Sequence, residues 1–333
     1  MTLGMGFLVV LGLALVCAGL WLIRLPAGYR VERRQQFARS RHDMQAYVLD
    51  YQRWQEWSPW LLHDPQTELH FFGNAAKVGS GYGWHSARIG QGDITTDAIE
   101  PGHSIAQTLK FFKPFKSQAQ VFFEFHEVAN NPDACELRWV MDAKVPLPMR
   151  PFLPMFKHMI GMDFELGLAR MVGALDATAP HPRITFIGVC TRPAQAVIKR
   201  SYTGPLKDLP AFFAKAYSEL SLQAGDTVNG QPLALYHKIN TKDSSTHCDA
   251  GLPVSDTYVG LDAQAAGAGK FFHVRLQGDY RFLGSTWNAA MGHARMQKYK
   301  LDKRRPALEV YTNQPGAVTG SNDLLTELLV PIR

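Results

Sequence analysis

The second half of the chain repeats itself, and this repeat limits the folds open to the chain more than any other feature. In the first copy, a strand-like run reaching Gly204 precedes an amphipathic helix and then a strand ending at Tyr236. In the second copy, Gly278 and Tyr311 hold the same two places. The glycine precedes its tyrosine by 32 positions in one copy and by 33 in the other, and each copy finishes with one more strand. This spacing predicts two strand-helix-strand-strand units that pack on one another, because a duplicated unit of this size cannot close a core alone.

The two copies span about 184–256 and 270–333, within a predicted domain over 183–333. Between them, the alanine- and glycine-rich stretch over 262–269 is predicted to be a flexible linker. Ligand pockets commonly form where two such units meet. We therefore expect a binding groove between the copies.

Three phrases of this half resemble the GyrI-like effector-binding domain, the ligand sensor of some multidrug-responsive regulators. They are Tyr202-Thr-Gly-Pro205, Leu308-Glu-Val-Tyr-Thr-Asn-Gln-Pro315 and Leu325-Thr-Glu-Leu-Leu-Val-Pro-Ile332. The resemblance implies that a glutamate on the strand before the last turn faces the pocket, and Glu309 holds that place. The aromatic residues expected to line the pocket with it are Tyr202, Tyr236, Trp287 and Tyr311.

A carboxylate set among aromatic rings offers charge complementarity and cation-π contacts to a flat or cationic ligand. The alternative for Glu309 is an ordinary surface glutamate on an edge strand. For each aromatic residue, the alternative is a place in the hydrophobic core.

The region over 28–178 has a different order of elements. A strand-like run over 29–37 and a helix over 43–54 lead into a turn-rich stretch, and a long helical stripe over 152–174 closes the region. Between them, five strand-like runs separated by turn signals span 81–87, 94–99, 104–112, 120–128 and 136–143. Together with the repeated half, this pattern predicts an α+β protein with antiparallel sheets.

This order resembles the SRPBCC superfamily, whose members have the START-like and polyketide-cyclase-like helix-grip fold. The phrases that carry the resemblance are Trp54-Gln-Glu-Trp-Ser-Pro-Trp60 and Asp163-Phe-Glu-Leu-Gly-Leu168. The fold implies an apolar pocket between the sheet and the closing helix, for a lipid or a polyketide-like molecule, and it does not imply catalysis. Strand alternation turns Phe123 and Trp139 inward, and Trp84 joins them as a candidate pocket wall, with core packing as the alternative.

The N-terminal stretch is apolar and uncharged from residue 3 to residue 23, a run of 21 residues. As a helix it would be about 31 Å long, which matches the hydrocarbon core of a bilayer. A cleaved signal peptide is the alternative, but it needs basic residues ahead of the apolar run, and Met1-Thr2 supplies none. The sequence thus predicts a single-pass transmembrane helix over 3–23.

Arginines gather on the C-terminal side of this segment, beginning with Arg24, Arg30, Arg33 and Arg34. The positive-inside tendency then favours the cytoplasmic side of a bacterial inner membrane for the soluble body, with the periplasmic side as the alternative. These arginines also account for much of the net charge of +6, and no helix-turn-helix, zinc-finger or RNA-binding motif is present. We expect no nucleic-acid partner.

The sequence gives no sign of metal or cofactor chemistry. The four cysteines include no CxxC pair, and the histidines of the first domain lack the spacing of metal ligands. No serine elbow, metalloprotease helix or cysteine nucleophile motif occurs, so no catalytic residue, cofactor or metal ligand is predicted.

These features predict a membrane-anchored binding protein that senses, buffers or sequesters a small hydrophobic or cationic molecule, with the lipid bilayer as its other partner. Two alternatives come from other classes. One is a hydrolase or cyclase that acts in one of the pockets, with Glu309 and a tyrosine hydroxyl as acid and base. The other is a lipid-transfer protein.

Overall fold

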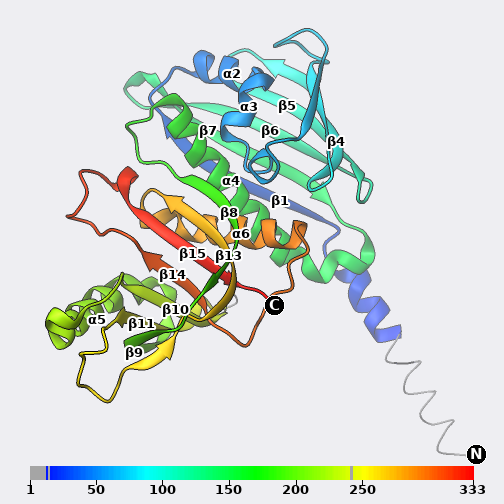
Figure 1. Cartoon of the computed structure of the whole chain (residues 1–333). Coiled ribbons are helices and arrows are strands. Elements are labelled where there is room, and N and C mark those ends of the chain that lie inside the picture. Colours follow the sequence, from blue (N-terminus) through cyan, green and yellow to red (C-terminus); the bar gives the residue numbers. More distant parts are fainter. Residues whose placement is uncertain (1–12, 14–15, 241–242) are drawn as a thin grey trace, which may run out of the picture. The chain divides into compact units, whose positions relative to one another are not determined.

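A computed structural model describes residue 13 and residues 16–240 and 243–333 of the 333-residue chain (Figure 1). The chain divides into two compact units, Met1–Met171 and Val172–Arg333. Each unit has one sheet, and all of the pairings within the two sheets are antiparallel. The predicted α+β class with antiparallel sheets is confirmed.

The predicted transmembrane helix over 3–23 lies mostly outside the described residues. Residues 16–24 are helical. Within the part of the chain that is described, no helix combines the length and the apolar character needed to cross a bilayer. Arg150 donates hydrogen bonds of 3.1 Å to the carbonyl oxygens of Ile23 and Leu25, where this short helix ends.

The sheet of the first unit has the strand order β1-β7-β6-β5-β4-β3-β2. Its strands are β1 Gly28–Phe37, β2 Glu68–Phe72, β3 Gly81–Ser86, β4 Gly90–Glu100, β5 Ser104–Lys113, β6 Ser117–Val128 and β7 Asn131–Lys144. The five predicted runs correspond to β3 through β7. The turn-rich stretch also contains β2, a strand that was not predicted. An edge strand of five residues that is exposed at Glu68, His70 and Phe71 leaves only a weak alternation in the sequence.

The helices of this unit are α2 Arg41–Leu49, α3 Trp54–Trp57 and α4 Leu153–Leu175. The single helix expected over 43–54 is therefore wrong. Asp50 ends α2 with a non-helical backbone, and its carboxylate accepts a hydrogen bond from the Gln52 amide. This side-chain bond starts a separate 3₁₀ turn before α3, because aspartate competes well for nearby backbone amides.

Aromatic rings fill the space between α4 and the sheet. Trp139 on β7 stacks on Phe164 of α4, with ring centroids 4.0 Å apart and an interplanar angle of 7°. Phe123 on β6 stacks on Trp139 at 5.3 Å. A Cβ atom on Gly167 would lie 2.8 Å from Trp139 Cζ3, so glycine is what lets α4 approach the sheet this closely.

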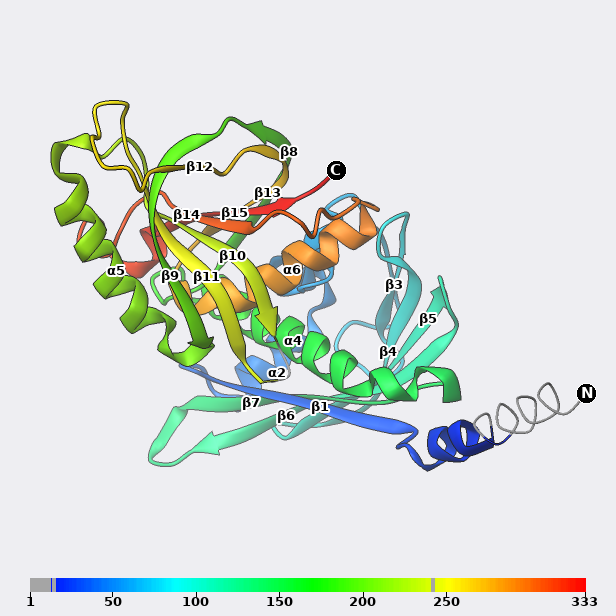
Figure 2. The ribbon, with the colours of Figure 1, turned by 90° about the horizontal axis from the view of Figure 1, so that it is seen from below.

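The sheet of the second unit has the order β12-β9-β11-β10-β14-β15-β13-β8. Its strands are β8 Arg183–Arg192, β9 Gln195–Pro205, β10 Leu233–Asn240, β11 Ser245–Pro253, β12 Gln264–Ala266, β13 Gly269–Gln277, β14 Ala307–Tyr311 and β15 Leu325–Pro331. Helices α5 Leu209–Ala224 and α6 Leu283–Met296 complete the unit, with α5 beside β9 and β11 (Figure 2).

The predicted duplication is present as β9-α5-β10-β11 and β13-α6-β14-β15. The copies meet where β10 pairs with β14. The strand that precedes each copy joins the other copy: β8 pairs with β13, and β12 pairs with β9. Residues 264–266 are thus a strand and not part of a flexible linker, which corrects that expectation. The two copies are therefore hydrogen-bonded to each other at the centre of the sheet, and at each edge the strand that precedes one copy pairs with the other copy.

Candidate functional site

Glu309 lies in β14, at the junction of the two copies. It is opposite Ala234 of β10, and its side of the strand faces the helices. Only 2% of the residue is exposed. Since β14 runs between β10 and β15, Glu309 is not a surface glutamate on an edge strand.

Three aromatic side chains donate hydrogen bonds to the Glu309 carboxylate. Trp287 Nε1, from α6, lies 2.5 Å from Oε1. The hydroxyls of Tyr236 and Tyr311 lie 3.1 Å and 2.7 Å from Oε2. All three donors are neutral, and no Lys, Arg or His within the described ranges forms an ion pair with this carboxylate. The negative charge is therefore held by hydrogen bonds alone.

Burial sets the electrostatics of this cluster. It raises the pKa of Glu309 above its ordinary value of 4.5, and the hydrogen bonds from Trp287, Tyr311 and Tyr236 oppose the shift only in part. Burial, followed by the nearby charge of Glu309, holds the pKa values of Tyr236 and Tyr311 well above 10.0. The site combines a carboxylate that is poorly solvated with hydroxyls that stay protonated.

A row of aromatic rings leads from this cluster along α5. Its members are Tyr202, Phe212, Phe213, Tyr217, Tyr280 and Tyr311. Tyr311 contacts Tyr217 and Tyr280 edge to face, with ring centroids 6.0 Å and 5.5 Å away. At the other end, Tyr202 stacks on Phe212 at 4.8 Å. The row presents ring faces and edges on the same side of the sheet as Glu309.

The structure brings together four of the predicted site residues, namely Glu309, Tyr236, Trp287 and Tyr311. Tyr202 lies on the same side of the sheet at the far end of the row, and its hydroxyl donates to the Pro205 carbonyl at 2.9 Å.

Phe213, Tyr217 and Tyr280 adjoin the cluster but are absent from the predicted site. Their signal in the sequence was partial. Phe213 and Tyr217 are four positions apart and share one face of α5. Nothing in the sequence shows that this face lies toward Glu309.

The candidates in the first unit are buried. Trp139 and Phe123 are 1% and 0% exposed and stack on each other, and Trp84 is 8% exposed with Phe111 at 5.4 Å. Their role as walls of a ligand pocket stays a prediction.

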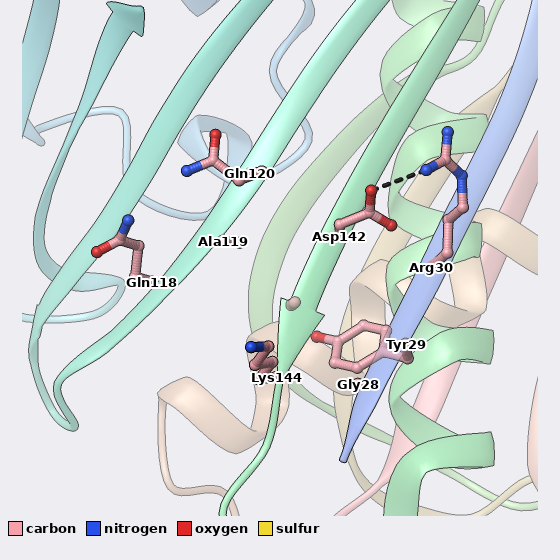
Figure 3. A pocket seen from close by; sticks show the side chains of 9 residues that line it. Gly28, Tyr29, Arg30, Gln118, Ala119, Gln120, Asp142 and Lys144 are labelled. Atoms are coloured by element: carbon pink, nitrogen blue, oxygen red, sulfur yellow. Dashed lines mark hydrogen bonds and ion pairs between the residues drawn. The ribbon is translucent and has the colours of Figure 1, made fainter. Parts of the chain in front are cut away.

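A hollow of about 610 Å³ lies elsewhere in the first unit, over β1, β6 and β7 (Figure 3). Its lining is Gly28, Tyr29, Arg30, Gln118, Ala119, Gln120, Asp142, Ala143 and Lys144. Arg30 and Asp142 form an ion pair of 2.8 Å there. None of the three aromatic candidates lines this hollow.

Comparison with known proteins gives matches to the second unit. The family model of the GyrI-like small molecule binding domain matches residues 186–333. A search among curated proteins gives no match. The SRPBCC resemblance of the first unit stays a prediction.

Solved structures with low identity are also similar to part of the chain. Protein MLL2253 from Mesorhizobium loti is 16% identical, with 45% of this chain and 99% of that chain covered and a TM-score of 0.35. The C-terminal domain of EcmrR is 16% identical, with 46% and 98% covered and a TM-score of 0.39. SAV2435, bound to tetraphenylphosphonium, is 15% identical, with 46% and 94% covered and a TM-score of 0.34. The stretch that matches the GyrI-like small molecule binding domain, residues 186–333, includes both copies of the duplicated fold.

Proposed function

We propose that this chain is a membrane-tethered binding protein for small aromatic cations, and that Glu309 selects them by charge. One observation carries the proposal. The Glu309 carboxylate is 2% exposed and accepts hydrogen bonds from three aromatic side chains, without an ion-pair partner within the described residues. A buried charge with no counter-ion is unfavourable, so a cation that reaches it is bound strongly.

The surroundings of Glu309 favour cations that carry aromatic groups. A positive charge near the carboxylate also lies near the rings of Tyr217 and Tyr280, which contact Tyr311. Cation-π contacts with such rings strengthen when water is excluded. Aromatic substituents on the ligand bury apolar surface against the same rings. An anion is repelled from the site, and a neutral apolar molecule gains no charge compensation.

Binding requires that at least one donor side chain moves, because the carboxylate is closed off from solvent. Tyr311 is buried, whereas Tyr236 and Trp287 are half-buried. We infer that Trp287 and Tyr236 turn aside and that the ligand takes over the hydrogen-bonded side of Glu309. Binding then exchanges neutral donors for a full positive charge.

The proposal predicts that Glu309→Gln weakens binding of a lipophilic cation. Tetraphenylphosphonium is a suitable probe, because it has a permanent charge and four aromatic rings. Removing one partner of a buried charge pair costs about 2 kcal/mol or more, which corresponds to a loss of at least about 30-fold in affinity. Isothermal titration calorimetry with the full-length chain in detergent measures this loss.

Glu327→Gln is the matched control. Glu327 lies on β15, opposite Val310 of β14. Val310 follows Glu309 in the strand, so the side chains of Glu327 and Glu309 lie on opposite sides of the sheet. Glu327 pairs with His273 and Arg275. We expect the control variant to keep wild-type affinity for tetraphenylphosphonium. Equal affinities of the wild type and Glu309→Gln contradict the proposed function.

We further propose that the N-terminal apolar segment holds the chain at a bilayer. In support, the described part of this segment presents apolar side chains to the surroundings. Val16, Leu20, Trp21 and Ile23 are all more than half exposed. Nearby in the fold, the segment around Arg150 that bonds to this helix also exposes Leu147, Met149, Phe152 and Met155. The order of β1, α2, the antiparallel sheet and α4 supports an SRPBCC-like first unit, with an apolar ligand as its expected guest.

A further inference from the structure

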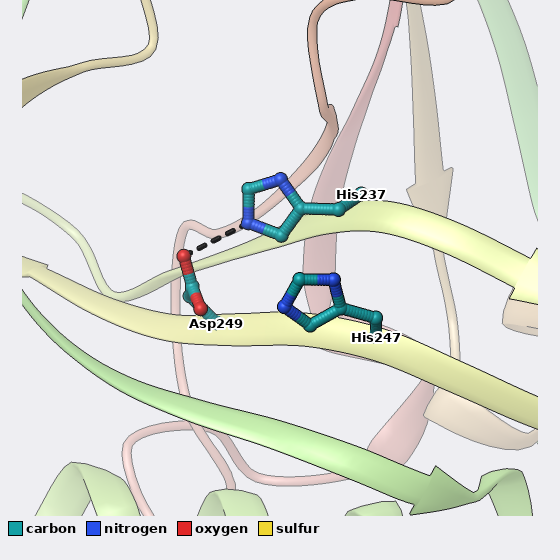
Figure 4. Close-up of side chains that lie close together, drawn as sticks. All are labelled: His237, His247 and Asp249. Carbon is teal, nitrogen blue, oxygen red and sulfur yellow. Dashed lines mark hydrogen bonds and ion pairs between the residues drawn. The ribbon is translucent and has the colours of Figure 1, made fainter.

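Two histidines and an aspartate lie together in the second unit, apart from the Glu309 cluster. His237 comes from β10, and His247 and Asp249 come from β11 (Figure 4). One ligand atom from each side chain lies within 4.8 Å of the other two. In the portion of the chain that the structure describes, no other three His, Cys, Asp or Glu residues meet in this way.

Strand alternation puts this cluster and Glu309 on opposite sides of the sheet. On β11, Cys248 lies opposite Tyr236, the residue whose hydroxyl reaches Glu309. Asp249 is the next residue of β11 and lies opposite Leu235, so its side chain points to the other face. A ligand held by the histidine-aspartate cluster is therefore separate from one held by Glu309.

A β-bulge brings His237 to the cluster. The pairing of β10 with β11 passes from Tyr236 opposite Cys248 to Lys238 opposite His247, which leaves His237 as an extra residue. Such a residue is re-aimed relative to the regular pleat. Its Nε2 lies 2.9 Å from Asp249 Oδ2, and its ring centroid is 4.8 Å from that of His247.

We propose that His237, His247 and Asp249 bind a divalent transition-metal ion such as Zn²⁺. Two imidazole nitrogens and one carboxylate oxygen are a ligand set that Zn²⁺ accepts, with a fourth position left for water or another molecule. Tetrahedral ligands at zinc distances of about 2.0–2.1 Å are about 3.3 Å from one another. Both histidines are exposed and have room to rotate by the small amount that closes the cluster from 4.8 Å to this separation.

The surroundings of Asp249 prepare its carboxylate for this role. The Ser201 hydroxyl donates a 2.7 Å hydrogen bond to Oδ1, which fixes the group and leaves Oδ2 toward the histidines. Ligating carboxylates are commonly held by such an outer hydrogen bond. Among the described residues, neither nitrogen of His247 has a hydrogen-bond partner, so its lone pair is available.

Lys199 is the group that competes with an ion. Its Nζ lies 3.6 Å from Asp249 Oδ2. The Lys199 side chain is partly exposed. Its long aliphatic part lets the ammonium group rotate toward the solvent when a metal ion binds Asp249. A single ammonium contact at this distance is weaker than coordination by three ligands to one divalent ion.

Titration of the full-length chain in detergent with Co²⁺ tests the proposal, because Co²⁺ reports its ligands through visible absorption and Zn²⁺ displaces it. We expect one Co²⁺ for each chain. His237→Gln and His247→Gln each remove a metal ligand. Loss of a residue that only supports a ligand weakens metal binding by up to about 100-fold, so we expect loss of a ligand itself to weaken Co²⁺ binding by at least about 100-fold. Both histidines are exposed, so the variants retain the fold, which circular dichroism verifies.

His273→Gln is the matched control. His273 also contacts a carboxylate, with Nε2 2.5 Å from Glu327 Oε2, but it belongs to no three-residue cluster within the described ranges. This variant should bind Co²⁺ like the wild type, whereas Ser201→Ala should weaken binding by about tenfold through the loss of the supporting hydrogen bond. The proposal is overturned if the wild type shows no saturable binding of Co²⁺ or Zn²⁺, or if His237→Gln and His247→Gln bind as tightly as the wild type.

Discussion

At the scale of single residues, the buried carboxylate of Glu309 is the main feature of the candidate site. It is removed from water and accepts three hydrogen bonds from neutral donors. A hydrogen bond to an ionised acceptor is stronger than one to a neutral acceptor. The loss of hydration still outweighs the three bonds, so the pKa of Glu309 is raised above 4.5. The group is thus stabilised in its protonated form by folding and in its ionised form by a bound cation.

We expect Glu309→Gln to remove a pH dependence from the stability of the second unit. With a folded-state pKa above 4.5, Glu309 contributes stability that is fully present below about pH 4.5 and is lost as the pH rises through the folded-state pKa. Glutamine does not titrate. Thermal melts between about pH 4 and pH 8 should therefore show the wild type losing stability relative to Glu309→Gln as the pH rises.

Glu327→Gln serves again as the control, with the opposite sign. Although burial raises the pKa of Glu327, hydrogen bonds from His273 and Arg275 outweigh it and hold the pKa below 4.5. Its contribution to stability is present above about pH 4.5 and is lost as the pH falls through the folded-state pKa. Parallel pH curves for the wild type and Glu309→Gln contradict the assigned shift.

At the scale of elements, close packing of one helix on one sheet defines the first unit. Helix α4 contacts the sheet at Gly167, which lies against the ring of Trp139. The same ring stacks on Phe164 of α4. Interiors of this density tolerate added atoms poorly. Backbone packing, and not helix propensity, explains this glycine.

Gly167→Ala is expected to destabilise the first unit although alanine favours helices. The gain in helix propensity is about 1 kcal/mol, but the new Cβ meets Trp139 at 2.8 Å and Pro59 at 3.1 Å. Overpacking of this kind costs about 1–3 kcal/mol. We expect a net loss of up to about 2 kcal/mol in the free energy of unfolding, measured by urea denaturation.

Gly161→Ala is the control within the same helix. There the new Cβ meets the guanidinium of Arg33, the far end of a flexible side chain that forms a partly exposed ion pair with Glu165. Such a pair is worth less than about 1 kcal/mol, so the propensity gain roughly offsets its loss. If Gly161→Ala is as destabilising as Gly167→Ala, the packing explanation is wrong.

At the scale of the whole molecule, the chain joins an apolar N-terminal segment to two units that each have their own sheet. The helix over 16–24 keeps Leu20, Trp21 and Ile23 more than half exposed. The proposal of a bilayer anchor rests on these exposed side chains and on the length of the uncharged run over 3–23, which matches the thickness of the hydrocarbon core.

We expect the full-length chain to float with liposomes in a density gradient and to remain bound at high salt. A helix inserted in the hydrocarbon core is insensitive to ionic strength, whereas attraction between the N-terminal arginines and anionic lipid is screened. Deletion of residues 1–27 should leave the protein in the dense fractions. Release of the full-length chain by salt, or flotation of the truncated chain, contradicts the proposed anchor.

Several elements were predictable because their signals are local. The five runs of the first sheet and the closing helix have strict periodicity, and turn residues separate them. The short strands β2 and β12 were missed, since their pairing partners stabilise them more than their own composition does. The end of α2 at Asp50 depended on a single side-chain hydrogen bond.

The duplication and the place of Glu309 on a strand of the second copy could be predicted from the residues alone, because both follow from local periodicity and matched spacing. Three features appear only in the folded chain: Trp287 and Tyr236 converge on Glu309, β8 and β12 pair across the copies, and a bulge turns His237 toward Asp249. They could not be predicted, because strand register and helix packing bring together side chains far apart in the chain and neither leaves a local pattern.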